Sequence, residues 1–469
     1  MADDTSLISS QLKQDPRMIE GKKLIMEAVQ DYQNGLTYSS PSQSGLIQSY
    51  KETLETFHSI RGGKLYFPYL GSGWGHGSLV ELLDGSIKYD MISGIGPHFW
   101  GHSYPPLIEA AIDAALSDTI MQGHLQQNQD AFLISQLLVK VSGLDHCFLS
   151  SSGAMANENA LKLAFQKKSP ANRVLTFDKC FMGRTLTLSQ ITDKPAFRER
   201  LPLQLPVDYI PFYQAKDPEG STSRSLKALH HHLTRYPHQH AVMCFELIQG
   251  EGGFNMGTTH FFISLMKVLK DHDIPVFVDE IQTFGRTPQL FAYQYFQLED
   301  YVDLVTIGKL SQVCATLFRA HLKPKVGLLS QTFTSSTIAL QTSYWIIQHL
   351  LSDHFYGPTG KLVRLHARFE DHFKRLEAQW PDRIRGPYGI GAMIIFTPFD
   401  GEADRVARFV QDLFQAGVIS FVAGNHPTRV RFLIPAGVMT LEDVDAVMFI
   451  VEMVLAQDTT HQDKTRQSL

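Results

Sequence analysis

Between about residue 90 and residue 335, apolar segments of two kinds alternate along the chain. Short runs rich in β-branched and aromatic residues, with no helical period, predict buried strands, and longer segments with one apolar face predict helices. Strands are expected at 173–177, 241–246, 274–280 and 303–309, and helices at 156–167 and 259–271. Alternation of this kind predicts a doubly wound α/β domain with a mostly parallel sheet.

The flanking regions predict smaller units. The N-terminal region is polar, with an amphipathic helix expected around Met18–Tyr32 and a break at Ser39–Gly45. The chain is therefore expected to comprise an N-terminal helical segment that joins the small domain (1–69), a large α/β domain (70–340), a C-terminal α+β domain (341–456) and a disordered polar tail (457–469).

Three further segments have clear local patterns. Residues 71–77 (GSGWGHG) lack the Lys-Ser/Thr that follows a phosphate loop, so turns beside a cleft are expected there. Residues 79–89 contain Asp84-Gly85 between two apolar runs and predict a β-hairpin. Ser343–Trp380 has one long helical pattern.

Composition narrows the class of protein. The chain has 469 residues, of which 43% are hydrophobic and 19% charged, as in globular proteins of two or three domains. Its net charge of −5 gives no basic surface for nucleic acid or an anionic membrane. No apolar run is long enough to span a membrane, and the acidic start is unlike a secretory signal. Four scattered cysteines then favour reduced thiols in a cytoplasmic protein.

The ends of two predicted strands carry the chemistry. The run 274–280 ends in Asp279-Glu280, and the run 303–309 ends in Lys309. Ligands of open α/β sheets bind beyond the carboxyl ends of the strands. A lysine and a carboxylate delivered there suggest a Schiff-base lysine and an anion that keeps a ring nitrogen protonated, which are the protein groups of pyridoxal phosphate chemistry.

A third segment adds a site for phosphate. Ser152, Gly153 and Ala154 stand between an apolar strand (147–149) and a predicted helix. The free N–H groups and positive dipole end of a helix start favour a phosphate dianion, although serines also cap helices without any ligand.

Taken in order, six segments resemble the class III aminotransferases, and the branch acting on ornithine, acetylornithine, lysine and 4-aminobutyrate is most similar. The segments are Ser152–Ala154 with its helix, Phe181–Thr185, Glu246–Gly253, Val278–Thr287, Ile307–Lys309 and Thr332-Phe333. The resemblance covers roughly residues 70–455. It implies the fold type I architecture of pyridoxal-phosphate enzymes, a homodimer with active sites at its interface, and transfer of an amino group to a 2-oxo acid.

The resemblance assigns cofactor roles to particular residues. Lys309 would bind the cofactor covalently and then move the proton, and Asp279 would pair with the ring nitrogen. Phe181 would stack on the ring, Gln282 would bond its hydroxyl, and Glu246 would lie beside it. Ser152, Gly153 and Ala154 would hold the phosphate, together with Thr332 of the neighbouring subunit.

Three further residues are implied to bind substrate. Arg431 corresponds to the family's carboxylate-binding arginine, and Glu251 to a glutamate that neutralises this arginine when a distal amino group enters. Arg184 corresponds to a second arginine of the site. Structural salt bridges are the alternative for all three.

The chain also departs from the family pattern around the active site. Met182 replaces the usual His or Trp, and the segment 283–287 lacks one glycine. Residues 310–314 and 334–337 replace a glycine-rich loop and a Gly-Gly-Asn-Pro sequence. These changes affect the expected substrate more than the expected cofactor.

Other interpretations of the chain remain. The histidines at 230–232, 238 and 240 are expected on a solvated helix end, and no metal site is expected. The predicted reaction is a ping-pong transamination from an amino acid or ω-amino donor, most simply to 2-oxoglutarate. An aminomutase or decarboxylase of the same fold, or a non-catalytic cofactor-binding homologue, are the alternatives.

Overall fold

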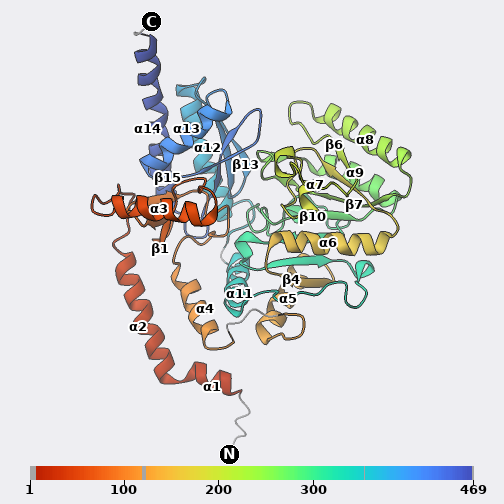
Figure 1. The fold of residues 1–469 in the computed structure, drawn as a ribbon, viewed down its shortest axis with the longest axis horizontal. Helices are drawn as coiled ribbons and strands as arrows, with labels where there is room; N and C mark the ends of the chain where they lie inside the picture. Colours follow the sequence, from red (N-terminus) through yellow and green to blue (C-terminus); the bar gives the residue numbers. More distant parts are fainter. Residues whose placement is uncertain (1–6, 119–122, 353, 467–469) are drawn as a thin grey trace, which may run out of the picture.

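A seven-stranded sheet forms the centre of the molecule. The computed structural model describes residues 7–118, 123–352 and 354–466 (Figure 1). In order across the sheet, the strands are β4 (His146–Ser150), β12 (Cys314–Phe318), β11 (Leu304–Ile307), β10 (Val276–Asp279), β7 (His240–Phe245), β5 (Arg173–Phe177) and β6 (Val207–Ile210). Only β12 runs antiparallel to its neighbours. The predicted mostly parallel α/β sheet of fold type I is confirmed.

Helices cover both faces of this sheet. The helices around it are α4 (Pro105–Ala115), α5 (Gln129–Ser142), α6 (Gly153–Lys168), α7 (Leu188–Ile191), α8 (Pro218–Arg235), α9 (Thr259–Asp271), α10 (Ala292–Tyr295) and α11 (Thr337–Ser352). Side chains of β10 alternate between two cores: Phe277 packs with α6, whereas Val276 and Val278 pack with α9. This alternation explains why the strands are continuous apolar runs.

A separate four-stranded antiparallel sheet forms in the C-terminal part of the chain. Its strands are β13 (Ile384–Ile390), β14 (Met393–Pro398), β17 (Arg429–Leu433) and β16 (Phe421–Ala423), in that order. Helices α12 (Lys361–Gln379) and α13 (Ala403–Ala416) pack against it, and α14 (Leu441–Arg466) packs against these two helices. Helix α14 continues into the segment expected to be disordered from residue 457, and residues 467–469 lie outside the described residues.

The N-terminal region consists of helices followed by a small sheet. The helices are α1 (Ile8–Gln14), α2 (Pro16–Gln33) and α3 (Ile47–Arg61), and the sheet orders β1 (Gly71–His76), β2 (Leu79–Leu82), β3 (Ile87–Asp90) and β15 (Val418–Ile419). Helix α2 packs against α4 at the edge of the molecule in Figure 1, and α1 packs against α2. None of the described helices combines the length and apolar character needed to cross a bilayer.

Two local predictions are wrong and one is confirmed. The predicted hairpin is the β2–β3 pair. The glycine-rich run is strand β1 and not a set of turns, because Gly75 packs directly on His102 and the Leu79 carbonyl, where a Cβ would lie 2.4 Å from each. The long pattern 343–380 is two helices, α11 and α12, separated near Gly357, whose φ of +83° cannot continue a helix.

Candidate active site

Lys309 and Asp279 lie close together at the carboxyl ends of two neighbouring strands of the central sheet. Strands β10 and β11 are parallel neighbours, with Asp279 opposite Thr306, and the chain then turns at Lys309 with a left-handed φ of +52°. The Lys309 side chain is partly exposed. Burial, followed by the positive charges of Arg431 and Arg286, lowers its pKa to about 8. A neutral amine, the nucleophilic form, is therefore accessible near neutral pH.

Asp279 is a buried carboxylate without a salt bridge to any described residue. It accepts hydrogen bonds from Asn157 Nδ2 (2.7 Å) and the Ile281 N–H (2.9 Å). Burial raises its pKa to about 6. A buried acceptor of this kind suits a cationic ring nitrogen, which would supply the missing countercharge.

Asn157 orients Asp279, but this role was not predicted from the sequence. Its Oδ1 accepts from the Thr306 hydroxyl (2.7 Å), and its Nδ2 also donates to the Met182 carbonyl (2.8 Å). The available signal was a polar residue on the apolar face of α6, between Ala156 and Ala160.

The start of α6 lies against the turn after β10. Ser152 caps the helix, and its hydroxyl accepts from the Met155 N–H (3.2 Å). A Cβ on Gly153 would lie 2.7 Å from Ile281 Cδ1, so glycine permits this close approach. The first-turn N–H groups of Gly153 and Ala154 have no carbonyl partner within the helix, which suits a phosphate dianion.

Glu246 and Gln282 are two buried polar side chains that lie close to Gly250. Glu246 is buried and accepts from the N–H groups of Phe181 (2.8 Å) and Gly250 (2.9 Å); burial, then Asp279, raises its pKa to about 8. Gln282 is also buried, and its Oε1 has no hydrogen-bond partner among the described residues. An unpaired buried acceptor there fits a hydroxyl donor such as that of the cofactor ring.

Arg431 and Glu251 form an ion pair at the other side of the site. Arg431, on β17, is fully buried and its Nη1 lies 2.8 Å from Glu251 Oε1. Its Nε and Nη2 have no partner among the described residues, which leaves two donors for a carboxylate. Burial alone would raise the pKa of Glu251, but the positive charges of Arg431, and then of Lys309 and Lys194, lower it.

Two further residues, Tyr66 and Arg286, were not predicted from the sequence. The ring of Tyr66 lies 4.5 Å from that of Phe421, over which Arg431 is placed at 5.6 Å. Arg286 is fully buried, donates to the carbonyls of Gln282 (3.3 Å) and Gly96, and contributes to the low pKa of Lys309. Tyr66 has no periodic signal, because it lies in a loop before the first strand.

The remaining predicted site residues are Arg184 and Thr332. Both are exposed, and no hydrogen bond or ion pair joins either to another site residue in the described part of the chain. The Arg184 guanidinium lies 3.8 Å from the ring centroid of Phe197. Thr332 belongs to the segment whose Gln331 carbonyl accepts from the His124 N–H (3.1 Å).

The histidines around α8 differ in part from their prediction. His230, His231 and His238 are exposed, as expected, but His240 is buried and its Nε2 lies 2.8 Å from Asp208. The expectation of a solvated face is therefore wrong for His240, because β7 places it in the sheet beside Asp208. The described residues contain no cluster of three or more side chains that could hold a metal ion.

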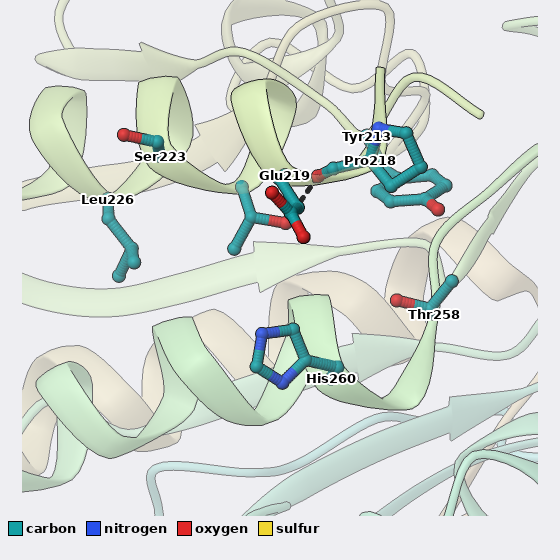
Figure 2. Close-up of a pocket in the computed structure, with 8 residues that line it drawn as sticks. Tyr213, Pro218, Glu219, Ser223, Leu226, Thr258 and His260 are labelled. Carbon is teal, nitrogen blue, oxygen red and sulfur yellow. Dashed lines mark hydrogen bonds between the residues drawn. The ribbon is translucent and has the colours of Figure 1, made fainter. Parts of the chain in front are cut away.

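An open hollow of about 420 Å³ lies between α8 and α9, and none of the predicted site residues lines it (Figure 2). Glu219, Ser223 and Leu226 line it from α8, and His260 from α9. The Thr258 hydroxyl in its wall already caps α9. We assign no chemistry to this hollow.

Comparison with known proteins adds the family context. Residues 72–455 match the family model described as aminotransferase class III. The acetylornithine aminotransferase of Methanocaldococcus jannaschii is 26% identical over 400 residues, which are 82% of this chain and 92% of that protein. The diaminobutyrate–2-oxoglutarate transaminase of Wolinella succinogenes is 28% identical over 75% of this chain and 83% of its own. Among solved structures, lysine aminotransferase from M. tuberculosis superposes with a TM-score of 0.76 at 23% identity, covering 86% of this chain and 99% of that one.

Proposed function

The chain belongs to the class III aminotransferases, which are pyridoxal-phosphate-dependent transaminases, and from this premise we propose that it transfers an amino group from an amino acid or ω-amino donor to 2-oxoglutarate. The observation that best supports the proposal is the meeting of Lys309 with the buried, unpaired carboxylate of Asp279 at the ends of β10 and β11. Transfer proceeds in two half-reactions, so donor and acceptor would use the same site in turn.

The residues around Lys309 would hold the cofactor. Asp279, oriented by Asn157, would receive the ring nitrogen, and Gln282 would accept from the ring hydroxyl. Phe181 would stack on the ring, with its backbone fixed by Glu246. The N–H groups at the start of α6, from Ser152 to Ala154, would bind the phosphate.

Pyridoxal phosphate supplies an electron sink that stabilises negative charge developing on the substrate carbon. Asp279 would maintain that capacity by keeping the ring nitrogen protonated. Lys309, with a pKa of about 8, would take a proton from the substrate carbon and return it at the other end of the conjugated system.

Arg431 and Glu251 would allow the same site to bind the amino donor and the 2-oxo acid in turn. With Glu251 bound, as the structure has it, Arg431 is neutralised and a donor's distal amino group can be accommodated. If Glu251 turns away, the full fork of Arg431 becomes available to the α-carboxylate of a 2-oxo acid. Acetylornithine, diaminobutyrate and lysine, named for the similar enzymes, all carry an amino group and a carboxylate, and we propose a donor of this class.

We also propose that the enzyme is a homodimer whose active sites lie at the subunit interface. Thr332 is exposed, and it would reach the phosphate bound by the neighbouring subunit. Phe333 beside it is 53% exposed, which is consistent with a surface that a second subunit covers.

The test mixes purified holoenzyme with L-ornithine, N-acetylornithine, L-lysine, L-2,4-diaminobutyrate or 4-aminobutyrate and follows cofactor absorbance. A productive donor should remove the band of the lysine-bound cofactor, and 2-oxoglutarate should restore it. Lys309→Ala should abolish this cycle, whereas Lys216→Ala, at an exposed loop lysine, should not.

Other outcomes would separate the alternatives. A rearranged or decarboxylated product formed without a 2-oxo acid would indicate an aminomutase or decarboxylase. A band that no amine changes would indicate a non-catalytic homologue, and turnover by Lys309→Ala would refute the assignment.

A further inference from the structure

One side chain of the segment 310–314, which departs from the family pattern, links the turn at Lys309 to a distant loop. Gln312 follows Lys309 in this turn, and its Nε2 donates to the carbonyl of Pro97 (2.9 Å). Pro97 stands 215 residues earlier in the chain. The hydrogen bond therefore joins the segment that carries Lys309 to a loop between the N-terminal sheet and the large domain.

Lys309 and Gln312 are the two ends of one tight turn. Both residues have left-handed φ angles, of +52° and +59°, and the Gln312 N–H donates to the Lys309 carbonyl (3.0 Å). Leu310 between them is fully buried against Gly285, where a Cβ would lie 2.8 Å from the Leu310 Cδ1. Left-handed conformations are unfavourable for residues other than glycine, so contacts outside the turn must maintain them. A displacement of Gln312 would therefore move the backbone of Lys309.

The loop that accepts this hydrogen bond, residues 93–98, is itself strained. Positive φ angles occur at four successive residues, with values of 52°, 65°, 64° and 101° at Ser93, Gly94, Ile95 and Gly96. Ile95 is the least favourable of the four, because β-branched side chains rarely adopt this conformation. A loop of this kind persists only where the surrounding structure holds it in place.

Hydrogen bonds hold this loop at both of its ends. At its start, Asp90 Oδ1 accepts from two consecutive backbone N–H groups, at 3.0 and 2.8 Å. At its other end, the buried guanidinium of Arg286 donates to the Gly96 carbonyl, and Gln312 donates to the next carbonyl along the chain. Arg286 is anchored independently, because it also donates to the Gln282 carbonyl (3.3 Å). Gln312 thus adds a direct link between a well-anchored loop and the lysine-bearing turn.

We propose that Gln312 is a positioning residue for Lys309: its amide fastens the lysine-bearing turn to the loop 93–98 and keeps the amine directed at the cofactor. Gln312 would act through Lys309 and would touch neither the cofactor nor the substrate. The inference rests on the proposed function, because it concerns the lysine of the same site. It gives a role to one residue of the segment in which this chain departs from the family pattern.

A double-mutant cycle on the binding of pyridoxal phosphate tests this role without turnover. Gln312→Met removes the donor and keeps the length of the side chain. With Lys309 present, it should weaken the affinity of the apoenzyme for the cofactor about fivefold, the size expected for one lost hydrogen bond. In the Lys309→Ala background it should have no effect, because the lysine through which it acts is absent. Equilibrium dialysis measures the affinity of all four proteins.

Three further variants control for the backbone and for the donor. Gln297 is also exposed and left-handed (φ +57°), and its side chain makes no hydrogen bond to the described residues, so Gln297→Met should match the wild type. Gln312→Lys keeps a donor of similar reach and should recover most of the affinity lost in Gln312→Met. Gln312→Gly removes the same donor and suits the left-handed backbone, so it replaces Gln312→Met in the cycle if that variant does not fold.

Two results would overturn the positioning role. One is equal weakening of cofactor binding with and without Lys309, which would indicate a general structural effect of the lost hydrogen bond. The other is unchanged affinity with Lys309 present. If the cycle showed full coupling between Gln312 and Lys309 but no amino group reached any acceptor, the proposed transamination would fail while the positioning role stood.

Discussion

Burial shifts the pKa values of Lys309 and of the carboxyl groups around it away from their ordinary values. The pKa of Lys309 lies at about 8, that of Asp279 at about 6 and that of Glu246 at about 8. Desolvation is the largest cause in each case, and it favours the uncharged form of every one. Such a group of perturbed side chains at a sheet edge is typical of a catalytic site.

At this scale we predict the pH dependence of covalent cofactor capture. Only neutral Lys309 attacks the aldehyde, so the capture rate should rise with pH and level off above about 8, and not near the 10.5 of an ordinary lysine. Arg431→Gln removes a nearby positive charge and should move the profile to higher pH. Stopped-flow absorbance of apoenzyme mixed with pyridoxal phosphate measures both, and a wild-type midpoint near 10 would contradict the prediction.

Asn157 gives a second prediction for single residues. Asn157→Ala removes the amide that donates to Asp279 at 2.7 Å and should lower kcat/KM about tenfold or more, because hydrogen bonds to charged groups contribute roughly 1.5–3 kcal/mol. Asn159→Ala is the matched control, since Asn159 is buried on the same helix but donates to Ser150. Equal loss in both variants would indicate a general effect on α6.

At the scale of elements, the phosphate site depends on how closely α6 approaches the turn after β10. Ile281 packs against both Gly153 and Gly308, so one side chain joins the helix start to the turn that presents Lys309. The positions of these two elements are consequently coupled. A substitution at the start of α6 should therefore alter the binding of the cofactor.

Gly153→Ala is the corresponding test. The added Cβ would lie 2.7 Å from Ile281 Cδ1, and overpacking of this kind costs about 1–3 kcal/mol. We expect a lower Tm and weaker binding of pyridoxal phosphate. Adding Ile281→Val, which removes Cδ1, should restore part of both, with Ile281→Val alone as the control; a double variant no better than Gly153→Ala would exclude this contact as the cause.

At the scale of the whole molecule, the site is assembled from the two main sheets. Lys309 and Asp279 come from the seven-stranded sheet, whereas Arg431 comes from β17 of the four-stranded sheet. The loop that carries Glu251 connects them, since the Gly424 N–H donates to the Glu251 carbonyl (2.9 Å) and Arg431 binds its carboxylate. The proposed cross-subunit Thr332 would add a third contribution from a second copy.

Hybrid dimers test that contribution. Lys309→Ala and Thr332→Val homodimers should each be impaired, the first in turnover and the second in phosphate affinity. Co-refolded hybrids should regain one intact site if Thr332 acts across the interface, because the wild-type Lys309 and Thr332 then meet there. Turnover at limiting pyridoxal phosphate measures the recovery, and no gain over the two homodimers would argue against a shared site.

The sequence by itself determined the sheet, the cofactor and the family. Strands β5, β10 and β11 and helix α9 were predicted closely because their apolar patterns are strong and local. Asp279 and Lys309 could be recognised because the ends of parallel strands converge in any sheet of this kind.

Only the tertiary structure decided which other side chains complete the site. Asn157 and Tyr66 have no distinctive spacing in the chain, and they matter because packing brings them near Asp279 and Phe421. The strand at 71–76 and the division of 343–380 into two helices likewise depend on close backbone contact and on one left-handed glycine. Periodicity reports which face of an element is buried, but which elements share that burial is fixed by long-range packing.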